Sequence, residues 1–138
     1  MNARFATLVE MPWPLLFSVV VGGLHTLFYL GVGGIFVRDA TIAPAFRQVA
    51  LLMAGAALLM AICLALPTWA LASRKRAGRA PLLVLFVCEA MAYLVTIGNF
   101  ALWVNLLGLL AAPAAWGLLT AQTRAYLGVA DRPDLFDD

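Results

Sequence analysis

Apolar residues in this chain occur in long runs that are separated by short polar segments. The runs cover about residues 15–37, 45–72, 81–98 and 100–121. A helix needs about 17–25 mainly apolar residues to cross a hydrocarbon core of about 30 Å. The last two runs form one stretch, which we divide at Gly98-Asn99 because this pair is typical of a turn. The pattern predicts four transmembrane helices, with the first loop at Arg38–Arg47.

Composition indicates that lipid is the solvent for most of the surface. Hydrophobic residues make up 64% of the 138 residues and charged residues only 12%, and the mean hydropathy is +0.97. A soluble domain of this size could not bury so much apolar surface. We therefore expect one all-α integral membrane domain over residues 1–138, folded as a four-transmembrane-helix antiparallel bundle.

The distribution of positive charge predicts the orientation in the membrane. With four spans, the chain ends and the middle loop lie on one side, which holds seven of the nine basic residues: Arg4, Arg74, Lys75, Arg76, Arg79, Arg124 and Arg132. Because basic loops remain cytoplasmic, both termini are expected to be cytoplasmic, in a bacterial plasma membrane. Arg74, Lys75, Arg76 and Arg79 could also contact anionic lipid, but we favour a role in setting topology. The formal charge of +2 does not indicate nucleic-acid binding.

Glu89 lies in the middle of the third apolar run. A carboxyl group inside a membrane costs several kcal/mol at least and usually faces other helices or a wet cavity. Tyr93 and Thr96 follow it at i+4 and i+7, so the three residues share one stripe of a helix. This stripe fits a proton- or cation-responsive site, a neutral, hydrogen-bonded carboxyl that fixes helix packing, or a contact with a partner subunit.

His25 lies at a similar depth in the first apolar run. The stripe through it includes Ser18, Gly22, Tyr29 and Gly33. Helices one and three of the predicted bundle run in the same direction, so a His25–Glu89 pair is possible if those helices are neighbours. The alternative is a structural hydrogen bond from His25 to any nearby carbonyl or hydroxyl, and for a lone histidine we favour this alternative.

The other polar residues give weaker signals. In the fourth run, Asn105, Gly108 and Ala112 form a stripe that is typical of helix–helix packing. Cys63 and Cys88 lie inside apolar runs, and neither has ligand spacing to the single histidine. We therefore expect no metal site and no cofactor. No motif of a catalytic site is present, and an enzyme is not expected.

The C-terminal quarter carries a resemblance. Its sequence VNLLGLLAAPAAWGLLTAQTRAYLG, with Thr123-Arg124-Ala125-Tyr126 near the end, resembles the last span of small four-helix actinobacterial membrane proteins of unassigned function. The resemblance implies four spans and a bacterial plasma membrane, and it implies no activity. Small multidrug transporters are of similar size, but their essential glutamate is on the first helix, so that function is not transferred.

These features favour a non-catalytic accessory or scaffold subunit. Small-residue helix faces suggest packing against other membrane subunits or against a second copy, in addition to the lipid bilayer. The alternative is a small oligomeric transporter or ion-coupled channel that works through Glu89 and His25.

Overall fold

The computed structural model describes residues 10–96 and 102–129, and within these ranges the chain forms helices and no strand. The elements in order are α2 (Trp13–Ile42), the 3-10 turn η1 (Pro44–Phe46), α3 (Arg47–Ala72), the 3-10 turn η2 (Arg76–Gly78), α4 (Arg79–Thr96), α5 (Leu102–Leu119) and α6 (Ala121–Tyr126). The all-helical class predicted from the sequence is confirmed for these residues.

Three of the described segments are long and apolar enough to cross a membrane, and they make this chain a membrane protein. They are Trp13–Ile42, Pro44–Ala72 and Arg76–Leu94. The last apolar helix contributes a shorter described segment, Leu106–Leu119. Large apolar side chains on all of these helices remain exposed, as expected where lipid covers them.

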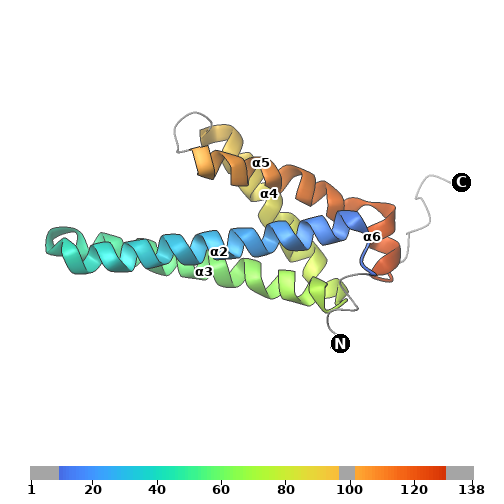
Figure 1. The fold of residues 1–138 in the computed structure, drawn as a ribbon, viewed down its shortest axis with the longest axis horizontal. Coiled ribbons are helices and arrows are strands. Elements are labelled where there is room, and N and C mark those ends of the chain that lie inside the picture. The colour runs from blue at the N-terminus through green and yellow to red at the C-terminus, as the bar shows by residue number, and fades with distance from the viewer. Residues whose placement is uncertain (1–9, 97–101, 130–138) are drawn as a thin grey trace, which may run out of the picture.

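The helices form two hairpins of unequal length (Figure 1). Helices α2 and α3 lie side by side along their whole length, and their turn extends well beyond the α4–α5 hairpin. Helices α4 and α5 pack on the other half of α2–α3, close to α6, and their far ends diverge from α2. The interior therefore lies where the two hairpins meet.

The first loop is shorter than predicted. Helix α2 continues through Arg38 and Asp39 to Ile42, so the loop expected at 38–47 begins five residues too early. Pro44 ends the helix, because the residue before a proline avoids the helical region, and Ala43 has φ −119° and ψ 83°. With 30 residues, α2 is about 45 Å long, which exceeds a hydrocarbon core of about 30 Å.

The buried core joins the two hairpins. Leu15 of α2, Leu82 and Phe86 of α4, and Leu118 of α5 are fully buried. Gly117 allows α5 to approach α2 closely, since a Cβ atom at this position would lie 2.5 Å from the Pro14 carbonyl oxygen. The close contact of these helices therefore depends on a residue without a side chain.

The end of α3 adopts a Schellman motif around Arg74. The Arg74 N–H donates to the Leu71 carbonyl (3.0 Å) and the Lys75 N–H donates to the Ala70 carbonyl (2.8 Å). Arg74 has φ 57°, a left-handed conformation that is costly for a residue with a Cβ atom. The equivalent position after α6 is Gly128, with φ 64°. Arg74 thus occupies a place where glycine is the usual residue.

Candidate functional site

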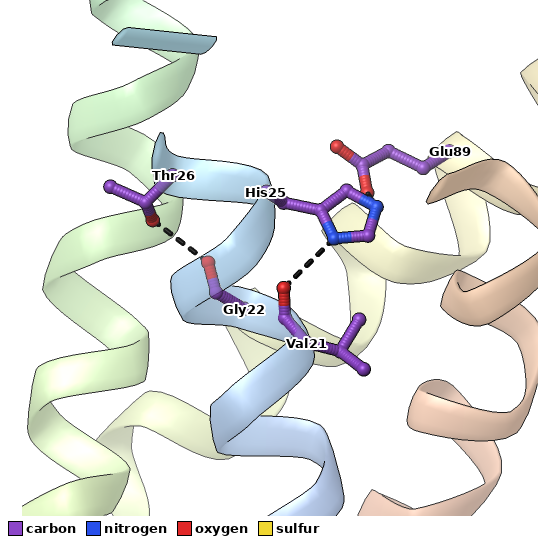
Figure 2. A network of polar contacts seen from close by, with 5 residues as sticks. All are labelled: Val21, Gly22, His25, Thr26 and Glu89. Carbon is purple, nitrogen blue, oxygen red and sulfur yellow. Dashed lines mark hydrogen bonds and ion pairs between the residues drawn. The ribbon is translucent and has the colours of Figure 1, made fainter. Parts of the chain in front are cut away.

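His25 is buried in the middle of α2, and its ring points toward α4 (Figure 2). The ring nitrogen Nδ1 lies 2.8 Å from the Val21 carbonyl oxygen, one turn earlier in the same helix. A carbonyl oxygen only accepts hydrogen bonds, so Nδ1 must carry a proton. The other nitrogen, Nε2, is therefore the position at which His25 gains or loses its charge.

Glu89 of α4 meets this second nitrogen. Its Oε2 lies 3.1 Å from His25 Nε2, and the two side chains are only 9% and 3% exposed. The sequence left a His25–Glu89 pair as one of two alternatives, and the structure shows this contact together with the other alternative, the hydrogen bond of His25 to a backbone carbonyl. The two atoms are in close polar contact, although His25 Nε2 and both Glu89 oxygens have no partner of regular hydrogen-bond geometry among the described residues.

The short distance between the two groups favours a proton between them. If both Nε2 and the carboxyl group lost their protons, two hydrogen-bond acceptors would face each other at 3.1 Å, which is unfavourable where water is scarce. With one proton the pair is either an imidazolium facing a carboxylate or a neutral imidazole facing a carboxylic acid. Either form can hold α2 against α4, and the difference between the forms is a proton that can be exchanged.

Two aromatic residues border the pair. Phe86, one turn before Glu89, is fully buried and meets the His25 ring edge-on, with the ring centroids 5.8 Å apart. Tyr29, one turn after His25, is half-buried and also interacts with the Glu89 carboxyl. Phe86 fixes the plane of the imidazole, and Tyr29 gives the carboxyl a second polar neighbour. Tyr29 was a predicted site residue, whereas Phe86 has no sequence feature that distinguishes it from a core residue.

The two predicted stripes are divided among several neighbours. In the stripe through His25, Ser18 lies 2.7 Å from the Ala114 carbonyl oxygen of α5, whereas Gly22 faces Thr68 of α3. Tyr93 is half-buried and packs on Gly108, where an added Cβ atom would lie 2.6 Å from the Cβ of Tyr93. The side chain of Thr96 lies outside the described residues.

The stripe predicted on the last long helix is only partly correct. Gly108 contacts α4, but Ala112 is exposed, since the buried face of α5 runs instead through Ala111, Ala114 and Leu118. The shift of register is small, but it turns Ala112 away from the neighbouring helices. The side chain of Asn105 lies outside the described residues.

Basic residues lie at and directly after the connection between α3 and α4, and two of them, Arg74 and Arg79, form hydrogen bonds with other parts of the chain. Arg74 donates to the Tyr126 hydroxyl and to Glu10 Oε2, both at 2.5 Å, and these bonds raise the pKa of Arg74 further above its ordinary value. Arg79 donates through Nε to the Leu118 carbonyl (2.8 Å) at the end of α5, where a cation is favoured by the helix dipole. Lys75 Nζ lies 4.9 Å from the centre of the Trp69 ring, and Arg76 is exposed.

Sequence reasoning placed Ser18 in the His25 stripe but did not predict its contact with α5, and it did not single out Thr68. Ser18 Oγ lies between the carbonyl oxygens of Pro14 (2.9 Å) and Ala114 (2.7 Å) and so ties α2 to α5. Thr68 of α3 is buried against Gly22, and its hydroxyl has no hydrogen-bond partner among the described residues. Ser and Thr are common in membrane helices, and only their neighbours on other helices distinguish these two.

Comparison with known proteins adds no relative: no family model, no curated protein and no solved structure matches this chain. The geometry of the helices and of the His25–Glu89 pair therefore bears on function.

Proposed function

We propose that this chain is a non-catalytic membrane subunit whose α2–α3 hairpin packs against another membrane-embedded surface, either of a larger complex or of a second copy. The observation that supports the proposal is the outward face of α2. Gly31 and Gly34 are exposed there, and a Cβ atom added at either would meet nothing within 4 Å. Small residues on an uncovered face allow close helix approach in lipid.

The opposite face of α2 illustrates the use of glycine within the chain. At Gly33 an added Cβ atom would lie 3.4 Å from Leu58 of α3, and at Gly22 it would collide with Thr68. These two glycines therefore bring α2 and α3 together. Gly31 and Gly34 provide the same shape on a face that no described residue covers.

The proposal includes a four-span antiparallel topology with both termini on the cytoplasmic side of a bacterial plasma membrane. The start of α2, the α3–α4 connection and α6 lie at one end of the molecule (Figure 1). That end carries Arg74, Lys75, Arg76 and Arg79. The opposite end, at the α2–α3 turn, carries Arg38 and Arg47 next to Asp39. The greater positive charge supports assigning the first end to the cytoplasm.

The proposal is tested by the size of the particle that mild detergent extracts. The full chain should elute in a particle larger than one copy, and Gly31→Leu with Gly34→Leu should reduce it to a single chain of unchanged thermal stability. Leu59→Phe, which adds bulk at an exposed position of α3, is the control and should leave the particle intact. A wild-type chain that elutes alone, or a double variant that elutes like the wild type, would contradict the proposal.

A second candidate is a small transporter or ion-coupled channel, and the buried His25–Glu89 pair favours it. A carboxyl and an imidazole that share one proton inside a membrane are suited to proton exchange. In liposomes with a pH gradient, this candidate predicts a flux that Glu89→Gln abolishes and that Asp39→Asn, at the α2–α3 turn, leaves intact. If Glu89→Gln changes only the particle size and not the flux, transport is excluded.

A further inference from the structure

A cleft of about 730 Å³ lies between α3 and α4. It is lined by Cys63, Leu66 and Ala70 of α3 and by Ala80, Pro81 and Val84 of α4. The walls are apolar, and the volume lies within the roughly 300–1,000 Å³ of sites that bind small molecules. From Ala70 to Cys63 the cleft extends about 10 Å along α3, and it is an open apolar groove along which one acyl chain can lie, not an enclosed cavity.

One end of the cleft lies at the connection between α3 and α4, residues 73–78. Ala77 and Gly78 of η2 form this end, directly after Lys75 and Arg76. The loop is held against α3 because Gly78 has no side chain, and a Cβ atom there would collide with the Pro67 carbonyl oxygen. One end of the apolar α3–α4 cleft therefore lies next to a short segment that carries positive charge.

Not all of the basic residues are available to a ligand. Arg74 is engaged by Glu10 and Tyr126, and Arg79 by the Leu118 carbonyl. Lys75 is exposed and lies over the exposed Trp69 ring, and Arg76 is exposed. No carboxylate among the described residues pairs with either of these two. Within this part of the chain, Lys75 and Arg76 thus carry positive charge without a carboxylate partner, directly before the two residues of η2 that line the groove.

The cleft at the other end of the molecule differs in both respects. It lies inside the α2–α3 turn, has a volume of about 330 Å³, and includes the carboxylate of Asp39 among apolar residues such as Phe36 and Phe46. It is smaller and has a negative group in its wall. Of the two clefts, the α3–α4 cleft is therefore the one that combines apolar walls with nearby basic residues that have no carboxylate partner in the described ranges, Lys75 and Arg76.

We propose that the α3–α4 cleft binds one anionic phospholipid, with an acyl chain between Leu66 and Val84 and the phosphate group at Lys75 and Arg76. The charge of Lys75 and Arg76 selects an anionic headgroup, since each basic residue near a membrane surface contributes attraction to anionic lipid. The apolar walls select a lipid and not a free phosphate ester. This site is independent of the packing face at Gly31 and Gly34.

Lipid retention measured by mass spectrometry of the intact chain tests the site. The chain in detergent is titrated with phosphatidylglycerol, with phosphatidylcholine of the same acyl chains, and with glycerol phosphate. One phosphatidylglycerol should be retained in preference to phosphatidylcholine, and glycerol phosphate should not bind. Equal retention of the two lipids would overturn the headgroup assignment and with it the proposal, and binding of glycerol phosphate alone would show a phosphate site without a lipid.

Two variants separate the headgroup from the chain. Lys75→Gln with Arg76→Gln should weaken phosphatidylglycerol retention by about 10- to 30-fold, whereas Arg38→Gln with Arg47→Gln, the matched change at the α2–α3 turn, should have no effect. Val84→Trp should fill the cleft and abolish the retention of phosphatidylglycerol, although the charges of Lys75 and Arg76 are unchanged. Val84 is exposed, so this variant should fold. Unchanged retention in either variant would contradict the site.

Cysteine labelling tests the site on the wild-type chain, so its result does not depend on whether a variant folds. Cys63 lines the cleft, and Cys88 is exposed elsewhere on α4. Phosphatidylglycerol should slow the reaction of Cys63 with a small apolar maleimide and leave that of Cys88 unchanged. Equal slowing at both cysteines would show general coating by lipid and would overturn the site.

Discussion

The two ends of this molecule differ in their contacts: the end near α6 has polar contacts between helices, whereas the α2–α3 turn exposes apolar side chains. At the end near α6, polar side chains bind the chain itself: Arg79 reaches the end of α5, and Arg74 reaches Glu10 and Tyr126. At the α2–α3 turn, the two longest helices continue without α4 or α5, and their large side chains, such as Ile35 and Leu52, remain exposed. Contacts within the chain hold the end near α6 together, whereas the surface of the α2–α3 turn is open to lipid or to a partner. Substitutions at the first end should therefore change folding stability, and those at the second should change assembly.

The largest expected effect on stability is that of Gly117→Leu. A side chain at this position meets the Pro14 carbonyl oxygen at 2.5 Å and Ser18 Oγ at 2.7 Å. Backbone atoms cannot move aside without separating α5 from α2, and overpacking of this kind costs about 1–3 kcal/mol or more. Thermal unfolding in detergent, followed by circular dichroism, should show a large fall in Tm. Gly31→Leu is the control on the uncovered face, and equal losses in both variants would remove the distinction between the two ends.

Loss of the Arg79 side chain should have the next largest effect. Its hydrogen bond to the Leu118 carbonyl closes the end of α5, and bonds from charged groups contribute about 1.5–3 kcal/mol when buried. Arg79 is half-buried, so we expect Arg79→Ala to reduce the free energy of unfolding by about 1 kcal/mol. The neighbouring exposed Arg76→Ala should have little effect on stability. Similar unfolding curves for the two variants would show that Arg79 serves only as a topology determinant.

The limits of prediction from sequence follow this division. The apolar runs predict the helices well because a membrane span requires them, and the matched depths of His25 and Glu89 followed from counting residues along two runs. The neighbours of a side chain are not available from such counts. Ala112 was placed on the packing face although α5 turns it outward, and Ser18 gave no sign that it would reach Ala114 on a helix far along the chain. Neither prediction is possible without the crossing angles of the two hairpins.

The His25–Glu89 pair should contribute a measurable but modest coupling. Hydrogen bonds inside membranes contribute on average about 0.6 kcal/mol and at most about 1.7. A double-mutant cycle of His25→Phe and Glu89→Gln should therefore give a coupling energy of about 1 kcal/mol. In each single variant the remaining group, Glu89 or His25, can be neutral. The larger penalty of leaving an unpaired ion buried is therefore avoided. Strictly additive effects would show that the contact at 3.1 Å contributes nothing to packing α2 on α4.

The smallest effect expected at the end near α6 is at Arg74, where backbone and side chain act in opposite directions. Its left-handed conformation, with φ 57°, favours glycine, whereas its side chain bonds to Glu10 and Tyr126 on the exposed surface. Exposed ion pairs contribute little and are screened by salt. Arg74→Gly should therefore be as stable as the wild type or more stable, and Arg74→Ala, which loses the bonds and keeps the Cβ atom, should be less stable than both. Thermal unfolding of the three chains in low and in 1 M salt separates the terms, because the deficit of Arg74→Ala relative to Arg74→Gly reflects the backbone and should not change with salt. A Tm of Arg74→Gly below that of Arg74→Ala would mean that the backbone at this position does not resist a side chain.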